Sequence, residues 1–135
     1  MARTKRKKQN GDDVRRLTGR WVFEMAYLLI DESEAPMERS EAMRQAHLVR
    51  RLLEQLGEGE VTFEYCRSDG SLRRARGTLA RGLSEAFDRY ERKLPLKPAV
   101  HDDGLHFTYW DLDKEAFRSF AVARVKRIIS TDHEQ

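Results

Sequence analysis

Few residues of this 135-residue chain have the types and spacing that catalysis or metal binding requires. The four histidines are spread along the chain: His47, His101, His106 and His133. His101 precedes Asp102 and Asp103, but no further ligand follows at a fixed spacing, which favours a turn over a metal site. The lone cysteine, Cys66, has no recognisable histidine partner that would activate it as a nucleophile. The sequence therefore predicts a protein that is not an enzyme and holds no metal or cofactor.

Arginine-rich stretches offer a different chemistry, which is the binding of phosphate groups. Arg74 and Arg76 alternate on a predicted strand and so face the same side, about 6–7 Å apart. A second group of cations lies in residues 116–131, which contain no acid: Arg118, Arg124, Lys126 and Arg127. If a curled sheet brings these strands together, the cations form a basic surface for a nucleic-acid backbone. The alternative is a solvated strand face whose arginines pair with nearby acids across a hairpin: Glu60, Glu64 and Asp69.

Two adjacent aromatic residues, Tyr109 and Trp110, are candidates for stacking on bases beside these cations. Single-strand binders combine cations with aromatic rings, and each stacked base contributes about 1–3 kcal/mol. Alternation places Tyr109 in the core with Leu105 and Phe107, and Trp110 on the opposite face of the strand. The alternative for Trp110 is burial beneath the second of two predicted helices.

The positive charge of the chain is concentrated at its start. Residues 1–10 hold five cations and no acid: Arg3, Lys5, Arg6, Lys7 and Lys8. The other residues hold 21 Lys and Arg (26 in the chain less these five) against 23 Asp and Glu, a net charge of −2. Such a basic block is expected to be disordered when free and to bind phosphates through counterion release. The alternative is a terminus that serves only solubility.

Composition excludes a membrane-spanning protein and predicts a single domain. Hydrophobic residues make up 39% of the chain, enough for a modest core, and charged residues make up 36%. The longest apolar run, Met25–Ile30, is far shorter than the roughly 20 residues of a spanning helix. With one cysteine and no secretory signal at its start, the chain is expected to be cytoplasmic.

Hydrophobic periodicity predicts the elements that would position these residues. Two helices, at 12–30 and from 37–40 to 56, form an antiparallel hairpin, and the inner stripe of the second includes His47. The pattern then alternates with period two in five segments that read as strands: 61–65, 72–79, 105–112, 117–123 and 125–129. Gly77 is interpreted as a bulge or sharp bend. Residues 80–104 are expected to form a long excursion with one or two helical turns.

The segment Tyr109–Arg124 resembles the end of a WYL domain. In that family an aromatic strand is followed by a turn, then by Arg-x-Phe and a second arginine, which correspond here to Arg118, Phe120 and Arg124. With the hairpin at 61–79, the chain is similar to the WYL-like family of small Sm-like or SH3 barrels, a domain of unknown function related to WYL domains.

This resemblance covers residues 60–129. It implies a small barrel that binds nucleic acid or nucleotide-like ligands through basic and aromatic residues: Tyr109, Trp110, Arg118 and Arg124. In this chain Asp111 separates the aromatic pair from the leucine that follows.

We therefore predict an α+β chain in which an N-terminal helical hairpin packs on a small SH3/Sm-like β-barrel of four to five strands, with little exposed sheet edge. The expected organisation is a disordered basic tail, the helical hairpin, the barrel and a frayed tail: 1–11, 12–57, 58–129 and 130–135. The leading hypothesis is non-enzymatic binding of single-stranded DNA or RNA, or of a nucleotide-like ligand. The alternative is a protein–protein interaction module or self-assembling homo-oligomer without nucleic-acid binding.

Overall fold

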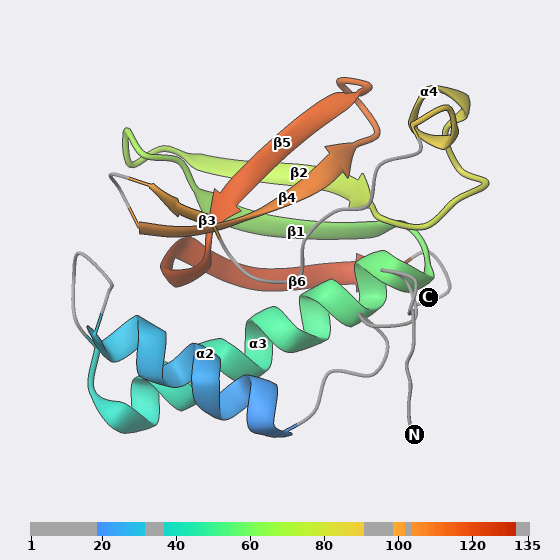
Figure 1. Cartoon of the computed structure of the whole chain (residues 1–135). Helices are drawn as coiled ribbons and strands as arrows, with labels where there is room; N and C mark the ends of the chain where they lie inside the picture. The colour runs from blue at the N-terminus through green and yellow to red at the C-terminus, as the bar shows by residue number, and fades with distance from the viewer. Residues whose placement is uncertain (1–18, 32–36, 91–98, 102–103, 132–135) are drawn as a thin grey trace, which may run out of the picture.

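The computed structural model describes residues 19–31, 37–90, 99–101 and 104–131. Two long helices precede a six-stranded antiparallel sheet, and a short third helix lies between its second and third strands, so the chain has an α+β fold (Figure 1). The helices are α2 (Gly19–Asp31), α3 (Arg39–Glu58) and the short α4 (Glu85–Asp88). The strands are β1 (Val61–Cys66), β2 (Leu72–Thr78), β3 (Ala99–His101), β4 (Gly104–Asp111), β5 (Ala116–Ala121) and β6 (Val125–Thr131), with a 3-10 turn η1 (Val122–Arg124) before β6.

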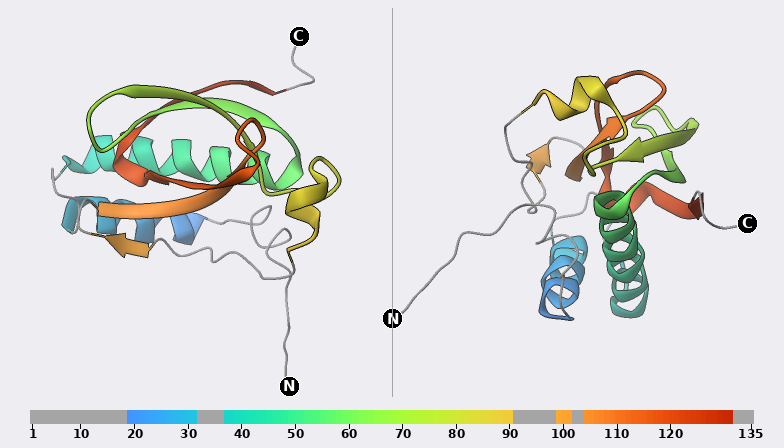
Figure 2. Two further views of the ribbon diagram at one scale, coloured as in Figure 1. Left: turned by 90° about the horizontal axis from the view of Figure 1, so that it is seen from above. Right: turned by 90° about the vertical axis from the view of Figure 1, so that its right-hand side faces the viewer.

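The two long helices form the predicted antiparallel hairpin and lie side by side on one side of the sheet (Figure 2). The buried stripe of α3 runs at three- and four-residue spacing through Ala42, Ala46, Val49, Leu53 and Leu56. The prediction for His47 is wrong. Its side chain is exposed because it follows Ala46 by about 100° around the helix and points away from the stripe.

The sheet curls but does not close into a barrel. Its strand order is β3-β4-β2-β1-β6, and β5 pairs with β4 outside this path. Six strands form rather than four or five, because β3 pairs with the start of β4 inside the predicted excursion. The excursion also contains α4, which confirms the expected helical turn. β6 continues to Thr131, into the segment predicted to be frayed.

Aromatic rings fill the space between the sheet and the helices. Phe63 lies 5.1 Å from the ring of Tyr109 and 5.8 Å from that of Phe120, both in edge-to-face geometry. Tyr109 is fully buried, as predicted. Gly77 pairs in regular register with Val61, so the bulge is wrong and the sharp bend, the other interpretation of this glycine, stays a prediction. The glycine is required for close packing, since an added Cβ would lie 2.6 Å from Cδ2 of Tyr109.

No helix in the described part of the chain is long and apolar enough to cross a bilayer.

Candidate nucleic-acid interface

The outer face of β2, β1 and β6 carries three of the predicted arginines. Glu64 on β1 is opposite Arg74 on β2 and opposite Arg127 on β6. Arg76 follows Arg74 on the same face of β2, opposite Thr62, which confirms the predicted alternation. Residues that are paired across antiparallel strands project from the same face of a sheet. We call Arg74, Arg76 and Arg127, together with Glu64, the outer-face cluster.

Glu64 holds the two flanking arginines in place. Its Oε2 accepts a hydrogen bond from Nε of Arg74 at 3.1 Å, and its Oε1 accepts one from Nε of Arg127 at 2.8 Å. The Glu64 side chain is 5% exposed, whereas those of Arg74 and Arg127 are 64% and 67% exposed. One buried carboxylate therefore orients two guanidinium groups that remain open to solvent, and these three residues together carry a net charge of +1.

The hydrogen bonds in this cluster also fix the charge of Glu64. The bond from Arg127, followed by that from Arg74, lowers the pKa of Glu64 below its ordinary value of 4.5, although burial acts in the opposite direction. Glu64 is thus a carboxylate at neutral pH, and it keeps accepting from both arginines.

Arg76 is neutralised more fully than its neighbours. Its NH1 lies 2.9 Å from Oε2 of Glu60, and its NH2 lies 2.8 Å from Oδ1 of Asp113. The alternative predicted for the arginine strand, pairing with acids across the hairpin, is therefore confirmed for Glu60 and Glu64. Asp69 instead accepts hydrogen bonds from Ser71 within the turn. Arg76 consequently offers less attraction for phosphate than Arg74 or Arg127.

Tyr109 belongs to a buried polar network inside the curled sheet. Its hydroxyl lies 2.9 Å from the hydroxyl of Tyr65. Burial, and then the hydrogen bond with Tyr65, raises the pKa of Tyr109. Arg73, also on the inner face, forms an ion pair with the fully buried Asp111. With its ring in the core, Tyr109 has no face on which a base could stack.

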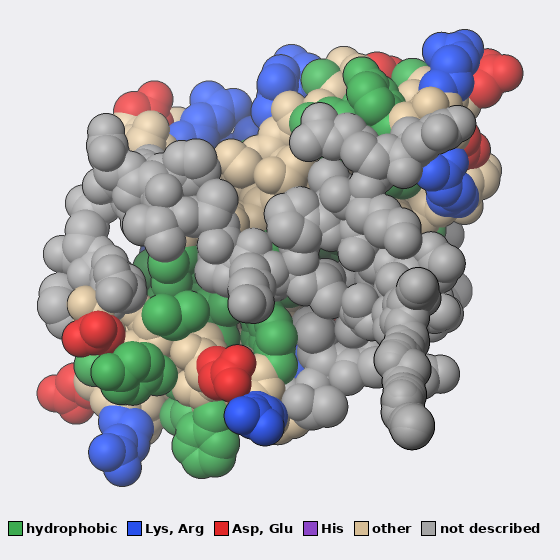
Figure 3. Space-filling model, viewed as in Figure 1, with side chains coloured by type: hydrophobic (Ala, Val, Ile, Leu, Met, Phe, Trp, Pro, Cys, Tyr) green, Lys and Arg blue, Asp and Glu red, His purple; other side chains and the backbone are tan. Residues whose placement is uncertain are grey.

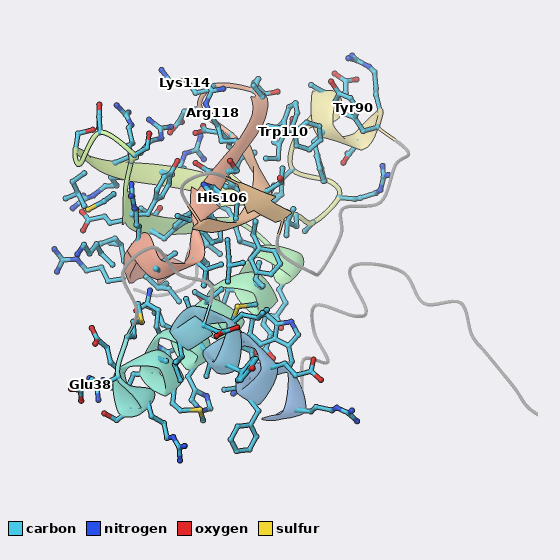
Figure 4. The ribbon with its side chains drawn as sticks, turned by 60° about the vertical axis from the view of Figure 1, so that its left-hand side comes forward. Glu38, Tyr90, His106, Trp110, Lys114 and Arg118 are labelled. Carbon is cyan, nitrogen blue, oxygen red and sulfur yellow. The ribbon has the colours of Figure 1, made fainter. Side chains whose placement is uncertain are left out.

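Trp110 lies on the face opposite Tyr109, as predicted, but the cover predicted for it is wrong. The segment around α4 covers it instead of α3: Phe87 and Tyr90 lie 5.6 and 5.8 Å from its ring, and Phe117 lies 4.9 Å away. Its Nε1 donates to Oγ of Ser84 at 3.1 Å, which also caps α4. Figure 4 shows Trp110 beside Tyr90 at this end of the sheet. Trp110 is 2% exposed and cannot stack on a base in this arrangement.

Of the remaining predicted cations, Lys126 adjoins the outer-face cluster, whereas Arg118 and Arg124 lie outside β1, β2 and β6. Arg118 is exposed on β5 and is paired with Tyr109 of β4. It therefore projects from the face of the β4–β5 pair opposite to that of Trp110. Arg124 lies in η1 and donates to the carbonyl of Arg67 at 3.0 Å. Lys126 is exposed at a register shift of β6, next to Arg127. The structure therefore does not bring Arg118 and the aromatic pair together as one stacking site.

The predicted tail cations lie outside the described residues: Arg3, Lys5, Arg6, Lys7 and Lys8. Within the part of the chain that the structure describes, no group of three or more His, Cys, Asp or Glu side chains gathers as a metal site.

Sequence reasoning missed the organising role of three residues. The hairpin register pairs Glu64 with Arg74, but Arg127 arrives from 63 positions further along the chain, and no local pattern predicts that contact. Asp111 pairs with Arg73 and also accepts hydrogen bonds from the backbone N–H groups of Asp113 and Lys114. The local signal for this role is an aspartate just before a turn. Ser84 before a helical turn is an N-cap signal, but its bond with Trp110 requires the tertiary fold.

Comparison with known proteins places this sheet in a described group. Residues 49–126, more than half of the chain, match the family described as WYL_2, Sm-like SH3 beta-barrel fold. The chain belongs to the WYL_2 family. No curated protein and no solved structure matches it.

The WYL_2 match begins within α3 and ends at the second residue of β6, so it includes β1 to β5 in full. It contains Arg74, Arg76 and Glu64 of the outer-face cluster, whereas Arg127 lies one residue beyond it. It confirms the resemblance predicted from the sequence and the Sm-like fold. The aromatic pair of this WYL_2 domain has structural roles, Tyr109 in the core and Trp110 beneath the α4 segment.

Proposed function

We propose that this WYL_2 domain is a non-enzymatic module that binds single-stranded nucleic acid or a nucleotide-like ligand through the outer-face cluster. The observation that supports this most is the pair of exposed guanidinium groups, Arg74 and Arg127, oriented by the buried Glu64. Nε of each arginine donates to the Glu64 carboxylate, and NH2 of Arg74 also lies 3.1 Å from Oε2. A guanidinium has five N–H donors, so both of these largely exposed side chains keep donors for a phosphate. Arginine with donors in a fixed plane suits bidentate phosphate binding.

The spacing of the cluster supports contacts to more than one phosphate. Arg74 and Arg127 lie one strand away from Glu64 on either side, so their backbones are about 10 Å apart. Lys126 adds a further exposed cation on the same edge strand. The basic block at residues 1–10 would add sequence-independent affinity through counterion release. Because Tyr109 and Trp110 are buried, the proposed contacts are to phosphates rather than to bases.

The test is the salt dependence of binding to a fluorescently labelled single-stranded oligonucleotide, measured by anisotropy on the whole chain. Each phosphate contact contributes about 0.7 to the slope of log K against log salt for a single strand. The double variant Arg74→Gln/Arg127→Gln is expected to lower the slope by about 1.4 for that reason. The matched control is Arg44→Gln/Arg51→Gln, which removes the same charge from exposed positions of α3.

A Glu64→Gln variant separates orientation from net charge. It makes the chain more positive by one unit, so net charge alone predicts tighter binding. If Glu64 orients two arginines, binding weakens instead. The proposal is overturned if the native chain does not bind at about 50 mM salt, if both double variants lose the same affinity, or if Glu64→Gln binds more tightly.

Self-association, the alternative predicted from the sequence, has support from a different surface, the exposed face of α2.

A further inference from the structure

Two large aromatic side chains project from α2 into solvent. Phe23 is 68% exposed and Tyr27 is 65% exposed. They lie one turn apart, and Figure 3 shows exposed hydrophobic side chains over this part of the molecule, with charged side chains beside them. The opposite side of α2 is packed against α3 and the core through Val22, Met25 and Leu29. α2 therefore has two apolar faces, and only one of them is covered within the described structure.

The exposed face offers both a projection and a recess. A shallow hollow of about 420 Å³, largely open to solvent, is lined by Phe23, Glu24, Tyr27 and Leu28, so the two rings form part of its border. A contact with two-fold symmetry requires one surface to be complementary to itself. Two copies of α2 meet this requirement if an aromatic ring of each copy lies against the shallow hollow of the other.

The charges of α2 favour an antiparallel arrangement of two such helices. Arg20 at its start is 86% exposed and contacts only Glu24 of its own helix among the described ion pairs. Asp31 at its end is exposed. Antiparallel pairing about a two-fold axis near residue 25 places Arg20 of each copy beside Asp31 of the other. A parallel pairing would instead bring like charges together.

We infer that the exposed face of α2 is the interface of a homodimer, in which two α2 helices pack antiparallel through Phe23 and Tyr27. One helix face buries less area than the 1,200–2,000 Å² of a standard stable interface, so the dimer is weak, with a dissociation constant of about 1–100 µM. This surface is distinct from the outer-face cluster, and the inference does not rest on nucleic-acid binding.

Sedimentation velocity of the whole chain from about 1 to 300 µM tests the inference, since this range spans the expected dissociation constant. Phe23→Ser is expected to raise the dissociation constant at least about tenfold, and because this side chain is mostly exposed the fold should be retained, as thermal melting by circular dichroism would show. Arg51→Glu, at an exposed position of α3, is the control for the charge-reversal variants described next, and it should leave the dissociation constant unchanged.

Charge reversal gives the more specific result. Arg20→Asp and Asp31→Arg should each weaken the dimer, because each places like charges side by side. The double variant Arg20→Asp/Asp31→Arg restores the opposite signs and should recover the native dissociation constant. A native chain that is monomeric across the whole range overturns the inference, as would occur if another segment or a different partner covers this face. A dimer that tolerates Phe23→Ser, or one that the double variant fails to restore, also overturns it.

Discussion

The ion pair between Arg73 and Asp111 gives the sharpest prediction about stability. Asp111 is fully buried, and the Arg73 side chain is 14% exposed. Replacing Arg73 by methionine keeps much of the packing but leaves the carboxylate without its cation. Breaking a buried pair in this way costs about 3–5 kcal/mol.

Two features of the structure place the expected cost at the lower end of that range. Asp111 retains the backbone donors of Asp113 and Lys114, at 3.0 and 2.9 Å from Oδ1. The substitution also removes Nε of Arg73, a buried group that has no hydrogen-bond partner among the described residues. We therefore expect Arg73→Met to lower the free energy of unfolding by about 3 kcal/mol.

Asp111→Asn should cost less, about 1–2 kcal/mol, because the amide oxygen still accepts from the turn and Arg73 can reach water. The double variant Arg73→Met/Asp111→Asn should be more stable than Arg73→Met alone, since no buried charge is left. Urea unfolding at pH 7, followed by circular dichroism, measures all three values. A cost below about 1 kcal/mol for Arg73→Met, or strictly additive costs in the double variant, would refute this account of the buried pair.

Three further predictions concern the core and pH. Gly77→Ala should lower the free energy of unfolding by about 1–3 kcal/mol, because the new Cβ meets the Tyr109 ring; a loss below about 0.5 kcal/mol in urea unfolding would contradict this. At alkaline pH the raised pKa of Tyr109 opposes ionisation in the fold, so stability should fall as pH rises above the ordinary value of 10.0, and Tyr109→Phe should flatten that decline. At acid pH the effect has the opposite sign, because the pKa of Glu64 is lowered in the fold: its contribution to stability is present above pH 4.5 and is lost as pH falls. Thermal melts of Glu64→Gln should therefore show a shallower loss of stability with acid, and an unchanged loss would contradict this.

Local periodicity was sufficient to predict most of the elements. The hairpin β1–β2 and the pair β4–β5 follow from alternation and turn residues that lie close together in sequence, and α3 follows from its apolar stripe. His47 shows the limit of this method, because a stripe several residues wide does not specify which edge positions face solvent. The short β3 was missed because three residues carry too little pattern to be separated from a loop.

The candidate site was predicted only in part, because its geometry depends on contacts between distant segments. Alternation correctly placed Arg74 and Arg76 on one face, and nearby acids correctly suggested partners for them. That Arg127 reaches Glu64 from the far side depends on β6 pairing with β1, which no turn specifies. Trp110 was assigned the wrong cover for a similar reason: α4 follows β2 in the chain, and only the tertiary fold returns it to the end of β4.

The central claim is that the outer faces of β1, β2 and β6 bind a polyanion, and mapping that surface by NMR tests it most directly. Amide resonances of the whole chain would be followed in ¹H–¹⁵N spectra while a single-stranded oligonucleotide is added. We expect the largest shifts at and beside Glu64, Arg74 and Arg127, with little change around Trp110. Shifts confined to residues 1–10 or to the helices, or none at all, would contradict it.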